Sequence, residues 1–168
     1  MKVISGGQTG ADFGGLAAAY QFGLETGGWM PPGFMTEAGS KPHWAKKFGL
    51  KTIATSGHPV ADYVARTYAN ARDSDATIRF ATHFDSKGEK CTLRAIKKFD
   101  KPYCDVNPDN PPPVSDVVDW IIQNDVKVLN VAGNRESKSP GLGRFVIGFL
   151  SQVFQEMGHK QKEEFRGK

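Results

Sequence analysis

The stretch KVISGGQTGAD, residues 2–12, decides the fold. Lys2 to Ser5 is a short run that predicts a strand, and the glycines after it mark a tight turn. These glycines open a predicted helix from about Thr9 to Phe22, which Gly23 is expected to end by adopting a left-handed conformation. A strand that turns directly into a helix is the first part of a βαβ unit.

The same alternation of short strands and helices continues along the chain. Strands are predicted at 24–29, 50–55, 76–81, 102–106 and 126–131. Helices are predicted from Pro59, over 89–99, from a Ser115 cap to about Asn124, and from Pro140 to Gly158. This pattern is typical of an α/β fold, a Rossmann-like three-layer sandwich with a mainly parallel sheet and helices on both faces.

Residues 30–49 interrupt this alternation. The stretch MPPGFMTEAGSKPHW is rich in glycine and proline, so we expect a long excursion that forms a lid or a rim loop. The chain contains no internal repeat and no second domain. We therefore expect one Rossmann-like domain, residues 1–158, followed by a polar tail, residues 159–168.

Composition narrows the classes of function. Of the 168 residues, 39% are hydrophobic and 24% are charged, which is ordinary for a soluble globular protein. No apolar run could cross a membrane, the N-terminus does not resemble a signal peptide, and two cysteines form no disulfide framework, so a cytoplasmic location is expected. The net charge of +4 comes without a track of basic and aromatic residues, which argues against nucleic acid as the partner.

Three segments carry candidate chemistry. In the first, Ser5 to Asp12, glycines let the backbone approach a ligand, and free N–H groups at the helix start favour phosphate. In the second, Val131 to Gly141, the guanidinium of Arg135 can bind phosphate or carboxylate, while Ser139 is expected to cap the helix. The third runs from Arg66 through Thr92. The candidate ligand-binding residues of these segments are Gly6, Gly7, Gln8, Thr9, Gly10, Asp12, Arg66, Asn70, Asp73, Lys87, Gly88, Thr92, Gly133, Asn134, Arg135, Glu136 and Ser137.

Each segment also has a structural interpretation. The first can be a tight turn without a ligand, Arg135 can pair with Glu136 or another carboxylate, and the third segment can be a solvated helix face and an ordinary loop. Because ligands of open parallel sheets bind beyond the carboxyl ends of strands, we expect all three segments to line one hollow. The four histidines and two cysteines lack metal-ligand spacing, so no metal site is predicted.

Four segments resemble a known family: ISGGQTGAD, the Gly28–Gly33 stretch with Glu37 and Gly39, RTYANARDSDATI, and LNVAGNRESKSPGL. They resemble the "putative molybdenum carrier" family, the circularly permuted YpsA-type branch of the SLOG superfamily of Rossmann-like proteins. The resemblance implies a Rossmann-like fold that binds nucleotides and related ligands. Some superfamily members cleave a nucleotide's base from its ribose phosphate.

The hydrolytic branch, the cytokinin-activating phosphoribohydrolases, allows a sharper comparison. If the chain is permuted, VAGNRESKSPG resembles that branch's first glycine-serine loop, ISGGQTG resembles its second, and Arg66 lies near the place of its catalytic arginine. The stretch SKGEKCTLRA stands where that branch has GGxGTxxE, but Ala95 takes the place of the glutamate. Glycosidic cleavage usually needs a carboxylate, so binding is favoured over catalysis, although Glu89, Glu136, Asp12 or Asp73 could substitute.

The leading hypothesis is therefore a protein that binds, and carries or sequesters, a phosphate-containing nucleotide-derived small molecule. The alternatives are a nucleotide N-glycosidase of the phosphoribohydrolase type, a molybdenum-cofactor carrier and, least favoured, a binder of single-stranded DNA. No cofactor is required by the first hypothesis, although a bound nucleotide or molybdenum cofactor fits the family. A homo-oligomer is compatible with the long apolar final helix, which could equally belong to the core.

Overall fold

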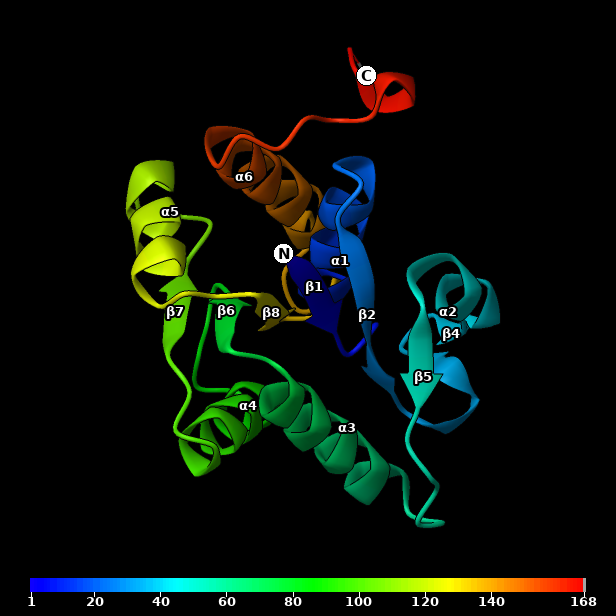
Figure 1. Cartoon of the computed structure of the whole chain (residues 1–168). Helices are drawn as coiled ribbons and strands as arrows, with labels where there is room; N and C mark the ends of the chain where they lie inside the picture. Colours follow the sequence, from blue (N-terminus) through cyan, green and yellow to red (C-terminus); the bar gives the residue numbers. More distant parts are fainter. Residues whose placement is uncertain (168) are drawn as a thin grey trace.

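A parallel sheet of six strands forms the centre of the computed structural model, which describes residues 1–167 (Figure 1). The strands follow the order β5-β2-β1-β8-β6-β7, and every neighbouring pair is parallel. Their bounds are β1 (Lys2–Ser5), β2 (Glu25–Met30), β5 (Leu50–Thr52), β6 (Ala76–Phe80), β7 (Tyr103–Val106) and β8 (Val128–Gly133).

Helices cover both faces of this sheet. One face carries α1 (Ala11–Gln21), α5 (Val114–Gln123) and α6 (Leu142–Glu156), while α3 (Pro59–Asp73) and α4 (Lys87–Lys98) pack side by side on the other (Figure 1). The expected three-layer Rossmann-like α/β fold is therefore confirmed.

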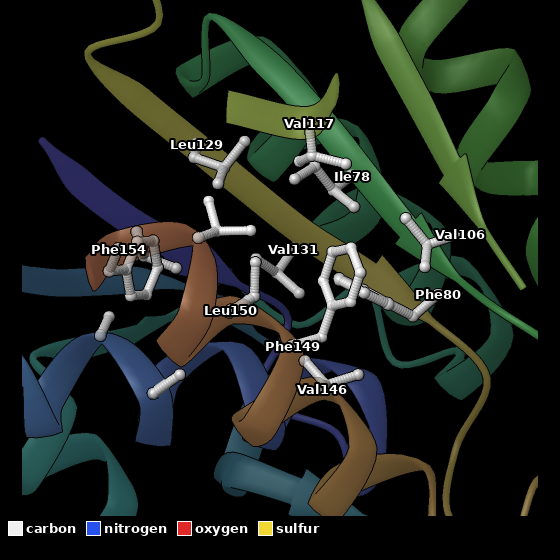
Figure 2. Close-up of a cluster of buried hydrophobic side chains, with 14 of the residues drawn as sticks. Ile78, Phe80, Val106, Val117, Leu129, Val131, Val146, Phe149, Leu150 and Phe154 are labelled. Carbon is white, nitrogen blue, oxygen red and sulfur yellow. The ribbon is translucent and has the colours of Figure 1, made fainter. Parts of the chain in front are cut away.

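The two faces of the sheet differ in chemistry. Beneath α1, α5 and α6 lies an apolar cluster that includes Ile78, Val131 and Phe154 (Figure 2). The alternate residues of the same central strands point to the α3–α4 side, and there Thr77, Arg79 and Asn130 are buried polar groups. The apolar residues of α6 thus belong to the core, and the other face of the sheet is buried but polar.

Residues 30–49 contain more regular structure than the sequence suggested. They form a single 3-10 turn (Pro32–Phe34), the two-residue strands β3 (Met35–Thr36) and β4 (Gly39–Ser40), and helix α2 (Pro42–Phe48). Ala45 and Phe48 of α2 pack with Leu16 and Met30 in a second apolar cluster. An excursion between β2 and β5 was expected, but helix α2 within it was not. This helix buries its apolar side chains against α1 and β2.

Helix ends are less well predicted than helix positions. Gly23 has a φ of +67° just after α1 and ends that helix as expected. Helix α5 begins at Val114, so Ser115 lies within its first turn and does not cap it. At the C-terminal end of the described chain, the Lys162 N–H donates to the Gln21 carbonyl at 2.8 Å, which places this segment against α1.

Candidate functional site

The carboxyl ends of the central strands bring two loops together. Residues 6–10 follow β1, and residues 134–141 follow its neighbour β8. The chain leaves β8 toward the α6 side, whereas it leaves the adjacent β6 toward α4 on the opposite side (Figure 1). Strands whose loops diverge in this way mark the ligand-binding edge of open α/β sheets. We refer to this edge as the rim.

The two loops interlock at Gly10. Its φ is +74°, and a Cβ atom there would lie 2.5 Å from the carbonyl oxygen of Asn134. The Ala11 N–H donates to that same carbonyl at 3.1 Å, and the Glu136 N–H donates to the Thr9 hydroxyl at 3.2 Å. The close approach of the two loops therefore requires a glycine at position 10. The sequence alone did not reveal this reason for the glycine.

A carboxylate of the protein itself sits between these loops. Glu37 lies in the turn between β3 and β4, and its side chain accepts hydrogen bonds from the hydroxyl of Thr9 and from both the hydroxyl and the N–H of Ser137. The Nε atom of Arg135 lies 3.9 Å from the same carboxylate. Burial raises the pKa of Glu37, but the hydrogen bonds from Ser137 and Thr9 outweigh burial and lower it overall. The rim therefore already holds one oxyanion.

Asp12 anchors the first loop from beneath. Its buried carboxylate accepts from the Gln8 N–H at 3.2 Å and lies 3.3 Å from the guanidinium of Arg66. A Cβ atom on Gly6 would lie 1.6 Å from that guanidinium, so the Arg66 side chain occupies the space directly above Gly6. Burial raises the pKa of Asp12 against the opposing effect of Arg66.

A second buried carboxyl group, Glu89, lies at the start of α4. Its Oε1 atom lies 3.4 Å from the Asn134 amide, and its Oε2 atom lies 3.7 Å from Arg79. Burial raises the pKa of Glu89 to about 7, and Asp12 and Asp105 add to this effect, whereas Arg79 and Asn134 oppose it. Glu89 is thus a proton-exchanging group at neutral pH close to the loop after β8.

Two candidates of the third segment lie deeper along α3. Asn70 binds the main chain of Trp29 twice, accepting from its N–H at 2.9 Å and donating to its carbonyl at 3.0 Å. Asp73 accepts from the Trp29 indole at 2.7 Å and pairs with Arg72, which lowers the pKa of its carboxyl group. The structure therefore brings Arg66 to the rim, whereas Asn70 and Asp73 contact β2 about one and two helical turns away.

The α4 candidates lie at the helix start. Lys87 and Gly88 are exposed in its first turn, while the buried hydroxyl of Thr92 donates to the Gly88 carbonyl at 3.1 Å. At the start of α6, Glu136 accepts from the N–H groups of Gly141 and Gly143 at 2.6 and 3.0 Å. Glu136 therefore performs the capping role expected of Ser139, whose hydroxyl instead contacts Thr82 and Asn134.

The hollow expected from the sequence is filled by side chains. Glu37 closes the space between the two loops, and Arg66 covers Gly6. Neither Glu37 nor Arg79 was among the candidate ligand-binding residues. Glu37 was named only among the residues that carry the family resemblance, and Arg79 lies in a strand that was predicted for its apolar residues. A charged residue inside a buried strand is the signal that could have identified Arg79.

Within residues 1–167 the structure contains no cluster of three or more metal-ligating side chains. In the same part of the chain, every helix is too short or too polar to cross a membrane. Both cysteines are free and half-buried.

Comparisons with known proteins agree with this architecture. The model of the circularly permutated YpsA SLOG family matches residues 3–154. The crystal structure of a protein from Syntrophus aciditrophicus SB, named "putative molybdenum carrier protein", superimposes with a TM-score of 0.79 at 32% sequence identity, covering 91% of this chain and 93% of that chain. A comparison with functionally curated proteins gave no match. With the family pattern running through nearly the whole sheet and both rim loops, this chain belongs to the circularly permutated YpsA branch of the SLOG family.

Proposed function

We propose that the rim binds a phosphate-bearing, nucleotide-derived small molecule, which the protein carries or sequesters. The ligand's phosphate takes the place of the Glu37 carboxylate between Thr9, Ser137 and Arg135. The observation that carries this proposal is the Glu37 site itself. Hydroxyl and N–H donors from two loops that are far apart in the sequence converge there on one oxyanion. Hydroxyl groups, main-chain N–H groups and a guanidinium are the donors that proteins commonly use for phosphate.

The segment that holds Glu37 can give way to a ligand. Its two strands, β3 and β4, have only two residues each and pair only with each other. A two-stranded hairpin is marginally stable by itself, so its position over the rim depends on a few polar contacts, including the donation from the Glu37 N–H to the Gln8 side chain at 2.9 Å. Phosphate carries more negative charge than a carboxylate and can compete for the same donors.

The other rim residues fit this role as secondary contacts. Lys87 and Gly88 offer a cation and the N-terminus of α4 near Glu89, and the loop around Gly6 and Gly7 brings the main chain close to Arg66. Asn70, Asp73 and Thr92 are proposed only as supports of the rim, because their hydrogen bonds connect elements of the protein to each other.

Titration with inorganic phosphate, followed by two-dimensional NMR, tests the proposal directly. The amide signals of Thr9, Arg135 and Ser137 should shift in a saturable way, and nucleoside monophosphates should bind more tightly than phosphate alone. Sulfate serves as a competitor of similar shape. If the signals of these three amides stay fixed at millimolar phosphate, the rim is not a phosphate site.

A molybdenum-cofactor carrier is the second candidate, favoured by the name of the Syntrophus protein. That cofactor is a phosphorylated pterin, so the donors around Glu37 fit its phosphate in the same way. In this case the cofactor is cargo, and native protein should co-purify with pterin fluorescence. Native protein that is free of pterin would count against this candidate and not against phosphate binding.

A hydrolase is the third candidate, favoured by Glu89. This buried carboxyl group, with its pKa of about 7, can supply the acid or base that Ala95 cannot. Release of free base from a nucleoside 5′-monophosphate, lost in Glu89→Gln and in Arg66→Ala, is the expected result for this candidate. An unchanged nucleotide after prolonged incubation leaves binding as the function.

A further inference from the structure

A hollow lies away from the rim, on the face of the sheet that α3 and α4 cover. It has a volume of about 200 Å³ and is partly open to solvent. The residues that define it are Lys2, Ile4, Gly27, Trp29, Lys51 and Asp73. The strand residues among them lie within β1, β2 and β5, whereas the rim loops follow the carboxyl ends of the strands. We call this space the β2 hollow.

The β2 hollow exists because the helices cover this part of the sheet unequally. Helix α2 packs on the opposite face, where Phe48 belongs to the same apolar cluster as Leu16 of α1. On the face of the hollow, α3 reaches β2 through the side chains of Asn70 and Asp73, and α3 ends at Asp73. The strip of β2 and β5 beyond the end of α3 is therefore left open.

Gly27, in the floor of the hollow, is a glycine that the backbone does not require. Its neighbour Gly28 has a φ of +125°, and a Cβ atom there would lie 2.1 Å from the carbonyl oxygen of Ser5. Gly27 has no such left-handed φ, and its nearest obstacle to a Cβ atom is the flexible end of Lys2, at 3.2 Å. Glycine weakens the interior of a strand and often marks a place where a ligand approaches closely. The missing side chain is therefore better explained by a floor that is kept clear than by folding.

The wall of the hollow is an aromatic ring that is held in place. The Trp29 indole N–H donates to the Asp73 carboxylate at 2.7 Å, and Arg72 holds the same carboxylate with bonds of 2.6 and 3.1 Å. Ile4, the partner of Gly27 in the sheet register, adds an apolar side chain. A fixed ring beside a clear floor suits a flat, apolar body. The volume of about 200 Å³ exceeds the roughly 150 Å³ of a protein cavity that accepts benzene, so a single ring fits.

Charge determines which flat molecule is favoured. Lys2 pairs with Glu25 at 2.7 Å, and Asp73 pairs with Arg72 at 2.6 Å, so these four charges balance. Lys51 has no carboxylate partner within residues 1–167. The hollow therefore carries one uncompensated positive charge at its edge, and an ammonium group binds a carboxylate with a charge-assisted hydrogen bond.

We infer that the β2 hollow is a second binding site, which takes a small aromatic carboxylate. The ring lies on Gly27 beside Trp29, and the carboxylate pairs with the ammonium group of Lys51. This site is separate from the rim and does not depend on the proposed phosphate site.

The test compares benzoate, its neutral analogue benzamide and acetate, which has no ring, by NMR titration of the full chain. Benzoate should shift the amide signals of Gly27 and Lys51 and the indole N–H signal of Trp29 in a saturable way, while the Ser137 amide stays fixed. Benzoate should bind at least about tenfold more tightly than either benzamide or acetate, because only benzoate supplies both the ring and the charge.

Two kinds of variant separate the floor from the charge. Gly27→Val fills the floor and should abolish benzoate binding without lowering the Tm, because valine favours strands. Lys51→Met should weaken benzoate by about tenfold and leave benzamide unchanged. Lys46→Met, at an exposed lysine of α2, is the matched control and should bind benzoate as wild type does.

Several results would overturn the second site. Benzoate that shifts Ser137 and leaves Gly27 and Trp29 fixed binds at the rim instead, and acetate that binds as tightly as benzoate shows that no ring is recognised. A folded Gly27→Val protein that keeps full benzoate affinity is equally decisive. If valine prevents folding, Gly27→Ala replaces it and should weaken benzoate severalfold. Signals that stay fixed at millimolar benzoate also exclude the site.

Discussion

Glu37 and Ser137 lie one hundred positions apart in the sequence, yet Ser137 donates both its N–H and its hydroxyl to the Glu37 carboxylate. The contact joins the small β3–β4 hairpin to the loop after β8. Under the proposed function this contact must break when a ligand binds, since the same donors cannot serve Glu37 and a ligand at once.

Removing the charge of Glu37 should strengthen the binding of phosphate. In Glu37→Gln the resident group can still accept hydrogen bonds but competes less, so the affinity for inorganic phosphate should rise by about tenfold, equivalent to roughly 1.4 kcal/mol. Isothermal titration calorimetry measures the change. Glu25→Gln, at an exposed carboxylate that pairs with Lys2, is the control and should leave the affinity unchanged. An affinity for phosphate that falls in Glu37→Gln would mean that Glu37 helps to build the site instead of occupying it.

Glu89 should make the protein less stable as the pH rises. Its pKa in the folded state, about 7, lies above the ordinary value of 4.5 for a glutamate, so the folded state binds the proton more tightly than the unfolded state does. This stabilising effect is complete below pH 4.5 and is lost as the pH rises through 7, at a cost of about 3 kcal/mol.

Glu89→Gln should remove this pH dependence. Urea unfolding at pH 5 and pH 8 measures this effect. The contribution of position 89 to the free energy of unfolding should be nearly the same at both pH values in Glu89→Gln, so the variant should become more stable relative to wild type at pH 8. Glu156→Gln, at an exposed position on α6, should follow wild type at both values. Parallel pH profiles for wild type and Glu89→Gln would rule out the raised pKa.

The interlocking of the two loops should depend on Gly10. A methyl group there meets the main chain of Asn134 and Glu136 at 2.5–2.6 Å and requires an unfavourable φ, so Gly10→Ala should lower the free energy of unfolding by roughly 2–4 kcal/mol. Gly148→Ala is the matched control, because that helical glycine has open space around it and alanine should raise stability by about 0.5–1 kcal/mol. Thermal unfolding distinguishes the two signs.

Asn70 should contribute to stability and not to phosphate binding. Asn70→Ala removes both hydrogen bonds to the Trp29 main chain in a buried setting, and the loss should be about 2–3 kcal/mol in chemical denaturation. Under conditions in which the variant is fully folded, its affinity for phosphate should stay within about twofold of the wild-type affinity. A large loss of affinity without a loss of stability would instead assign Asn70 to the ligand.

The fold was predictable because local pattern and global arrangement agree. Alternating strands and helices with short turns specify a parallel sheet covered on both faces, and the left-handed Gly23 follows from its place after an apolar helix. Helix α2 was missed because its apolar residues, Ala45 and Phe48, are too few to stand out between prolines and glycines. They become informative only once α1 and β2 supply a surface against which they pack.

The site was predictable only in outline. The loops were expected to meet because parallel strands end at the same edge of the sheet. That β1 and β8 are neighbours, which places their loops side by side, emerged only from the structure. That Glu37 lies between the loops depends on the path of a short hairpin, which no periodicity encodes. Arg66 and Asn70 lie one turn apart on α3, but their roles diverge because one side chain reaches Asp12 and the other reaches Trp29.

The apolar and polar faces of the sheet should differ in how easily the helices that cover them separate from it. Hydrocarbon packing beneath α6 should make that layer the part of the molecule that resists opening. On the other face, Arg79 ties α4 to the sheet by donating to the Glu89 carbonyl at 3.1 Å, and Asn70 ties α3 to the main chain of Trp29. We therefore expect the layer of α3 and α4, which carries Arg66 and Glu89, to open more easily than the layer of α6.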